Sequence, residues 1–171
     1  MGLFSFAKDI GDKIFHRNKD AAPASQPAST PTAAPTAAPV APAEPSAQEI
    51  ANLLIQRIQQ NATINNLSVN YNGDTDTVTI NGSAPTQADR EKAILAAGNV
   101  QHVAQVEDNI SVDTPEPESR MYTVKSGDTL SKIAKEMYGN ANDYNKIFEA
   151  NRPLLSDPDK IYVGQMLRIP A

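Results

Sequence analysis

The feature that most constrains this chain is a proline-rich segment, residues 21–47, that no regular element can cross. It consists almost entirely of Ala, Pro, Thr and Ser. Its prolines, five of them four residues apart, are Pro23, Pro27, Pro31, Pro35, Pro39, Pro42 and Pro45. Each proline lacks an amide hydrogen and fixes its φ angle, so neither a continuous helix nor a central strand can form there. Because large apolar side chains are almost absent, we predict an extended linker without a core of its own.

The N-terminal segment, residues 1–20, has the pattern of an amphipathic helix. Its apolar residues recur at helical spacing: Leu3, Phe6, Ala7, Ile10 and Ile14. Charged residues interrupt this apolar set, which argues against a secretory signal. The polar face mixes both signs of charge, whereas helices that lie on membranes favour Lys and Arg. We therefore expect the segment to dock on the protein itself.

Residues 48–113 predict a small α+β domain, which we call the middle domain. Ser46 and Glu49 are spaced to form a capping box before the first helix. The predicted order is helix, strand, strand, helix and strand, at residues 51–60, 67–71, 78–80, 88–97 and 103–112. Gly98 and Asn99 end the second helix, and the alternation of the last strand is expected to change phase near Asp108.

A short acidic hinge, residues 114–120, leads to a second small domain, residues 121–171, which we call the C-terminal domain. Its pattern predicts strand, helix, helix and strand. The first helix carries an apolar stripe, Leu130, Ile133, Ala134 and Met137, after a turn in which Asp128 or Thr129 can supply the cap. The whole chain is thus expected to be an α+β protein with two small domains, an N-terminal helix and a disordered linker.

Three motifs of the C-terminal domain resemble those of LysM domains. They are Tyr-x-Val-x-x-Gly-Asp-Thr-Leu from Tyr122, Asn-Lys-Ile-Phe-Glu-Ala-Asn from Asn145 and Gly-Gln-x-Leu-x-Ile-Pro from Gly164. The resemblance implies binding of glycans that contain N-acetylglucosamine, such as peptidoglycan. The implied contacts are Gly127, Asp128, Thr129 and Leu130, together with Asp159, Ile161 and Tyr162. The first four residues could equally serve only to shape and cap the helix.

The middle domain resembles a BON domain. The resemblance rests on Val-Thr-Ile-Asn-Gly-Ser-Ala from Val78 and on Gly-Asn-Val from Gly98, followed by an apolar last strand. In this family a glycine often precedes the valine that begins the last strand, but here the residue is His102. Histidine tolerates a positive φ angle poorly, so the backbone at this position is in question.

The amino-acid composition argues against several classes of function. The chain has 15 basic and 20 acidic residues, a formal net charge of -5, and no cysteine. No basic stripe suggests nucleic acid as a partner. The two histidines, His16 and His102, are far apart and show neither triad nor metal-site spacing. We expect a monomeric binding protein, not an enzyme, and no apolar run long enough to span a membrane.

The combination of both domains with the opening Met-Gly-Leu-Phe-Ser-Phe-Ala-Lys-Asp-Ile-Gly-Asp-Lys resembles the bacterial potassium-binding BON–LysM proteins. The resemblance implies a cytoplasmic protein that binds K⁺, changes shape and acts in envelope or osmotic stress. The alternative is an exported cell-wall accessory protein that binds peptidoglycan through its LysM domain, and the missing export signal counts against it.

Main-chain carbonyl oxygens are the ligands expected for K⁺, and the last carbonyls of a helix lack partners within the helix. Two predicted helix ends offer such groups. The hypothesis places K⁺ between the carbonyls of Ala7, Ile10 and Asp12 and those of Gly98, Val100 and Val103. The alternative is that Gly11 and Gly98 are ordinary helix caps, which the sequence by itself does not distinguish.

Overall fold

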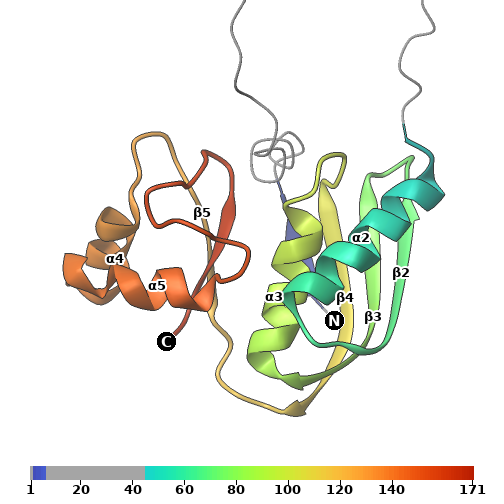
Figure 1. Cartoon of the computed structure of the whole chain (residues 1–171), viewed down its shortest axis with the longest axis horizontal. Coiled ribbons are helices and arrows are strands. Elements are labelled where there is room, and N and C mark those ends of the chain that lie inside the picture. Colours follow the sequence, from blue (N-terminus) through green and yellow to red (C-terminus); the bar gives the residue numbers. More distant parts are fainter. Residues whose placement is uncertain (1, 7–44) are drawn as a thin grey trace, which may run out of the picture.

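A computed structural model describes residues 2–6 and 45–171 of the chain. Within this part, the middle domain contains α2 (Ala47–Asn61), β2 (Asn65–Asn72), β3 (Thr77–Thr86), α3 (Gln87–Gly98) and β4 (Gln105–Thr114). The C-terminal domain contains β5 (Arg120–Thr123), α4 (Leu130–Tyr138), a 3-10 turn (Ala141–Asp143), α5 (Tyr144–Ala150) and β6 (Met166–Ile169). Figure 1 shows the two domains side by side, which confirms the predicted α+β class.

The helix α2 begins as its sequence predicts. The Ser46 hydroxyl accepts a hydrogen bond from the Glu49 amide, and the Glu49 carboxylate accepts one from the Ser46 amide, completing the capping box. Ile50, Leu54 and Ile58 follow at helical spacing and are buried. They pack α2 onto the sheet of the middle domain.

The sheet of the middle domain has the strand order β1-β4-β3-β2. Strand β3 runs parallel to β4, so α3 is the crossover between them, and β2 pairs antiparallel with β3. Helices α2 and α3 cover one face (Figure 1). Val78, Ile80 and Val106 point from the strands into this layer and are fully buried.

The expected change of phase in the last strand is wrong. Val106, Asp108 and Ile110 alternate without interruption on the buried side of β4. Asp108 can occupy a core position because the Nη2 atom of Arg90 lies 2.6 Å from its Oδ2 atom, and a buried carboxylate requires such a partner.

The predicted N-terminal helix is wrong for the residues that the structure describes there. Gly2–Ser5 forms β1, an antiparallel edge strand on β4 in which Gly2 lies opposite Asp108. Phe4 packs against the core, and Leu3 on the other face is 64% exposed. The apolar residues fit a period of two as well as a helical period, and the bare edge of β4 supplies unpaired backbone groups that favour the strand. The expected docking on the protein itself is confirmed for this stretch. The rest of the predicted helix and the linker as far as residue 44 lie outside the described residues.

The C-terminal domain follows its prediction closely. Thr129 caps α4 by accepting a hydrogen bond from the Lys132 amide, and Gly139 ends the helix in the left-handed region with φ 79. Strands β5 and β6 pair antiparallel, and Ile133, Ile147 and Leu167 form a separate core beneath the helices. In the described part of the chain, no helix has the length and apolar character needed to cross a membrane.

Candidate cation site

The predicted ion ligands of the middle domain lie in the loop that follows α3. This loop, residues 98–104, joins the end of α3 to β4. Asn99 is 1% exposed, Val100 4% and Val103 0%, while Gln101 and His102 between them are half-buried. The Asn99 amide bonds back to Leu95 and the Val100 amide to Ala97, so the last turn of the helix is closed. The loop therefore presents main-chain groups to the protein interior.

Two of the three predicted carbonyl oxygens have no donor among residues 2–6 and 45–171. The Val100 carbonyl accepts a hydrogen bond from the Val103 amide at 3.3 Å, but no described N–H or O–H group reaches those of Gly98 or Val103. A buried carbonyl without a partner is costly, and a cation satisfies it as well as a donor does. The loop thus offers carbonyl oxygens, which are the type of ligand that a dehydrated monovalent cation requires.

The described N-terminal residues reach the same place. The Phe6 amide donates to the Ala104 carbonyl at 2.8 Å, and the Phe6 ring covers Gly98. A Cβ atom at Gly98 would come within 2.1 Å of the ring, so only glycine allows this contact. The other predicted ligands, Ala7, Ile10 and Asp12, lie outside the described residues, which end at Phe6 on this side of the linker.

His102 takes up the position where the family pattern often has glycine. Its φ angle is 71, in the left-handed region, which is uncommon for any residue other than glycine. The Tyr71 hydroxyl lies 3.0 Å from the His102 carbonyl oxygen and 3.0 Å from Asp76 Oδ1. The His102 carbonyl therefore already has a partner, and Tyr71 ties the loop to β2.

The electrostatic surroundings of this loop favour a cation. Between residues 46 and 119 ten acidic residues stand against three Arg or Lys residues. The C-terminus of α3 adds the partial negative charge of a helix end. Among the residues that the structure describes, His, Asp and Glu form no cluster of three or more that could bind a metal through side chains. The main chain is thus the source of ligands that the loop can offer.

The same helix, α3, makes the contact with the C-terminal domain (Figure 1). The Asn99 carboxamide bonds to the main chain of Met166 in both directions, donating to its carbonyl and accepting from its amide, each at 3.2 Å. Nearer the start of α3, the Glu91 carboxylate pairs with the Arg168 guanidinium and accepts from the Ser119 amide. The sequence predicted only that Asn99 helps to end the helix, and no pattern in it pointed to a role for Glu91.

Glu91 is charged in this contact although it is 3% exposed. Burial raises the pKa of its carboxyl, but hydrogen bonds from Gln87, Ser119 and Arg168 outweigh burial and leave the pKa below its ordinary value. The pair with Arg168 is thus maintained as an ion pair inside the domain contact.

The predicted glycan residues lie in two adjoining loops of the C-terminal domain and, for Leu130, at the first position of α4. The Val124 amide donates to the Gln165 carbonyl and the Gly164 amide to the Val124 carbonyl, which holds the loop after β5 beside the loop before β6. In the second loop Asp159 is exposed, while Ile161 and Tyr162 are half-buried. The Tyr162 amide donates to the Gln165 side chain at 3.0 Å.

The first of these loops uses its polar groups internally. Asp128 Oδ2 accepts from the Lys125 amide at 2.8 Å and from the Tyr122 hydroxyl at 2.9 Å. The Thr129 hydroxyl caps α4 by accepting a hydrogen bond from the Lys132 amide, and the Gly127 carbonyl accepts one from Lys132 Nζ at 2.7 Å. Leu130 lies in the core and is 2% exposed. Burial and the bond to Asp128 raise the pKa of Tyr122 to about 12, and the Lys125 amide lowers that of Asp128.

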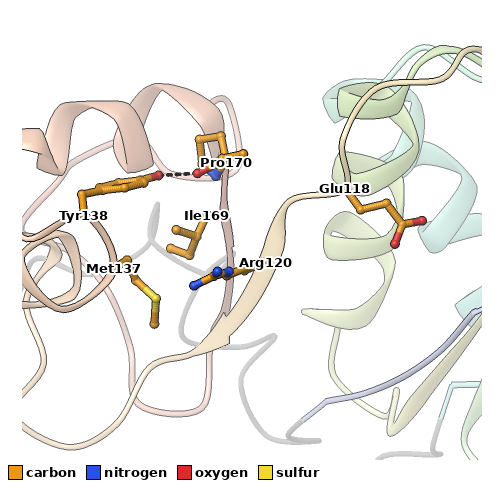
Figure 2. A pocket seen from close by; sticks show the side chains of 7 residues that line it. Glu118, Arg120, Met137, Tyr138, Ile169 and Pro170 are labelled. Atoms are coloured by element: carbon orange, nitrogen blue, oxygen red, sulfur yellow. Dashed lines mark hydrogen bonds between the residues drawn. The ribbon is translucent and has the colours of Figure 1, made fainter.

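A pocket that the sequence did not reveal opens between the hinge and the C-terminal domain (Figure 2). It measures about 370 Å³, and its lining includes Arg120, Met137, Tyr138 and Pro170. Arg120 extends from β5 toward Met137, and the Tyr138 hydroxyl donates to the Pro170 carbonyl at 2.8 Å. Among residues 2–6 and 45–171, none of the predicted ion or glycan residues lines this pocket.

Comparison with known sequences places both domains. Residues 46–114 match the BON domain family and residues 122–170 match the LysM domain family. The potassium binding protein Kbp of Escherichia coli O6:H1 is 40% identical over 170 residues, which covers 99% of both chains. A protein of Deinococcus radiodurans is 33% identical over 132 residues, 71% of this chain and 51% of its own length. A LysM domain-containing GPI-anchored protein 2 of Arabidopsis thaliana is 45% identical over 49 residues, 29% of this chain and 13% of its own length.

Proposed function

The chain belongs to the family of BON–LysM proteins that includes the potassium binding protein Kbp, and from this premise we propose that it binds K⁺ through the loop after α3. It acts as a binding protein and sensor, not as an enzyme. The ligand is the K⁺ ion, which is bound by the main-chain oxygens of Gly98, Val100 and Val103. The main-chain oxygens of Ala7, Ile10 and Asp12 are further ligands.

The observation that carries the proposal is the buried loop with unsatisfied carbonyl oxygens. Val103 is fully buried, and neither its oxygen nor that of Gly98 has a donor among the described residues. Carbonyl oxygens can replace the hydration shell of K⁺, whereas divalent ions favour carboxylates in numbers that the loop lacks. The net acidity of the middle domain raises the local concentration of cations without selecting between them.

The role of a sensor follows from how the N-terminal segment is attached. Strand β1 has four residues, and its docking rests on its pairing with β4 and on the contacts of Phe4 and Phe6. An ion shared between this segment and the loop after α3 would favour the docked state by its binding free energy. K⁺ would thus change the compactness of the protein. We place this activity in the cytoplasm, in the response to envelope or osmotic stress.

Titration with KCl and, separately, with NaCl tests the proposal. We expect calorimetry to show saturable binding of K⁺ and X-ray scattering to show a smaller radius of gyration in K⁺ than in Na⁺ at equal ionic strength. A variant without residues 1–20 should lose most of the affinity, since three of the proposed ligands are removed. Equal responses to the two salts would contradict the proposal.

A second candidate function is glycan binding by the C-terminal domain. It is favoured by the LysM match and by Val163, which is 60% exposed next to Tyr162 in the loop before β6. Exposed apolar and aromatic side chains beside polar groups are typical of sugar contacts. A pull-down with purified peptidoglycan, compared between the full chain and a Tyr162→Ala variant, tests this role independently of K⁺.

A further inference from the structure

The outer edge of β6 is completed by two asparagine side chains instead of a strand. Asn151, at the end of α5, donates to the Arg168 carbonyl at 2.8 Å and accepts from the Arg168 amide at 2.7 Å. Asn99 makes the same pair of bonds to Met166, two residues earlier on the same edge. The first clamp lies within the C-terminal domain, but the second comes from the middle domain. Strand β6 of the C-terminal domain is therefore hydrogen-bonded along this edge to Asn99 of the middle domain.

Asn99 stands between two of the proposed ion ligands, Gly98 and Val100. Its side chain is short, so two simultaneous hydrogen bonds to Met166 restrict the Asn99 main chain as well as the carboxamide. Asn99 is 1% exposed, so these bonds are shielded from bulk solvent. The orientations of the carbonyls on both sides of Asn99 are thereby tied to the main chain of β6.

We infer that Asn99 is a positioning residue for the ion loop and that β6 of the C-terminal domain is the template that aligns it. Asn99 does not touch the ion; it holds the Gly98–Asn99–Val100 backbone in the orientation that the ion requires. The two events are linked, so K⁺ also strengthens the bonds between Asn99 and Met166. The inference rests on the proposed binding of K⁺ at this loop.

A second polar contact between the domains provides an internal comparison. Glu91 and Arg168 join α3 to β6 as well, but Glu91 lies eight residues before Asn99, about 12 Å along the helix. That ion pair can hold the domains together without fixing the loop. If general attachment of the domains were enough for ion binding, weakening either contact would have the same effect on affinity.

The experiment uses the full chain with three substitutions. Asn99→Ala removes the clamp on Met166 and is compatible with the φ of -85 at this position. Glu91→Gln weakens the distant contact and leaves the loop unchanged. Asn151→Ala removes the equivalent clamp inside the C-terminal domain. Calorimetric titration with KCl gives the affinity, and hydrogen exchange at the Met166 amide, with and without K⁺, gives a readout that does not depend on affinity. Scattering confirms that the domains remain docked in each variant.

We expect Asn99→Ala to weaken K⁺ binding about tenfold, since two buried hydrogen bonds are lost. The two control substitutions should change the affinity by about twofold or less, because they lie outside the loop. Saturating K⁺ should slow exchange of the Met166 amide in the unaltered protein and not in Asn99→Ala.

Three results would overturn the inference. Unchanged affinity in Asn99→Ala would show that the loop is positioned without the clamp. An equal loss in Glu91→Gln would show that docking of the domains matters and Asn99 does not. A Met166 amide whose exchange ignores K⁺ would contradict the linkage. If the unaltered protein binds no K⁺, the proposed function itself fails. This failure is distinguishable from a failure of the inference about Asn99, because it is seen in the unaltered protein without any variant.

Discussion

The loop after α3 and the loop before α4 both adjoin a helix end and both contain a glycine beside a polar residue, but they use their polar groups in opposite ways. In the loop before α4, Asp128 and Thr129 are bonded to main-chain amides, and the Gly127 carbonyl is bonded to Lys132. In the loop after α3, the Gly98 and Val103 carbonyls have no donor among residues 2–6 and 45–171. The fold thus leaves main-chain acceptors without a described donor in the loop after α3, whereas it uses the polar groups of Gly127, Asp128 and Thr129 internally.

The largest expected effect comes from filling the space that Phe6 occupies. Gly98→Val would place side-chain atoms where the Phe6 ring lies 2.1 Å from a Cβ position, so β1 must leave its place. We expect loss of K⁺ binding and destabilisation by about 2 kcal/mol, measured by calorimetry and denaturant unfolding. Gly73→Ala is the matched control, since its Cβ would meet an ordinary contact at 3.7 Å. Full ion affinity in Gly98→Val would contradict the role of the N-terminal segment at this loop.

Glu91→Gln sharpens the account of the domain contact. Loss of the charge partner of Arg168 should destabilise the protein by about 2 kcal/mol at neutral pH. The folded pKa of Glu91 is lowered, so its contribution is fully present above its ordinary pKa and is lost as the pH falls through the lower folded value. Denaturant midpoints should therefore differ between the two proteins at neutral pH and converge only as the pH falls through the lowered folded pKa of Glu91. A difference that grows toward low pH would contradict the assignment.

Thr129→Ala tests whether the loop before α4 serves only the fold. Loss of the helix cap should cost about 1 kcal/mol, because the Lys132 amide loses its acceptor. The affinity for K⁺ should not change, since this residue lies in the other domain and outside its contact with α3. Binding to purified peptidoglycan should fall only to the extent that the domain unfolds. A glycan affinity that collapses while the domain stays folded would instead assign Thr129 to a sugar site.

The smallest expected effect is a gain in stability at His102. Its φ of 71 costs a side chain about 1 kcal/mol, so His102→Gly should raise the free energy of unfolding by up to this amount. Asn66→Gly is the control: its φ is 51, but asparagine tolerates this region, so the gain should be smaller. Thermal denaturation of both variants measures the difference. Destabilisation by His102→Gly would show that the imidazole makes a contact worth more than the backbone strain.

The sequence predicted the parts of this fold that depend on local patterns. The capping box of α2, the Thr129 cap and the alternation of β2 and β3 are each encoded within a few residues. Gly2–Ser5 was misassigned because its apolar spacing fits two periods, and only the open edge of β4, more than a hundred residues away, decides between them. Asp108 was misread for a similar reason, since its partner Arg90 lies on the helix that crosses over the sheet.

The candidate site was predictable only in part. The helix stop at Gly98 is visible in the sequence, and it is one of the observations from which the loop after α3 is proposed as the ion site. The Phe6 ring over Gly98 and the Asn99 clamp on Met166 depend on three segments that meet only in the folded chain. Main-chain ligands carry no side-chain signature, so the number of carbonyls that lack a donor had to come from the structure.

The most direct test of the central claim is the ¹³C chemical shift of the main-chain carbonyls during titration with KCl and with NaCl. The account predicts that the signals of Gly98 and Val103 shift with K⁺ until they saturate, and that they shift less with Na⁺. The signals of Gly127 and Asp128 should not shift in either titration. The account would be contradicted if the carbonyl signals of the loop after α3 did not change with K⁺, whether or not other signals showed saturable changes.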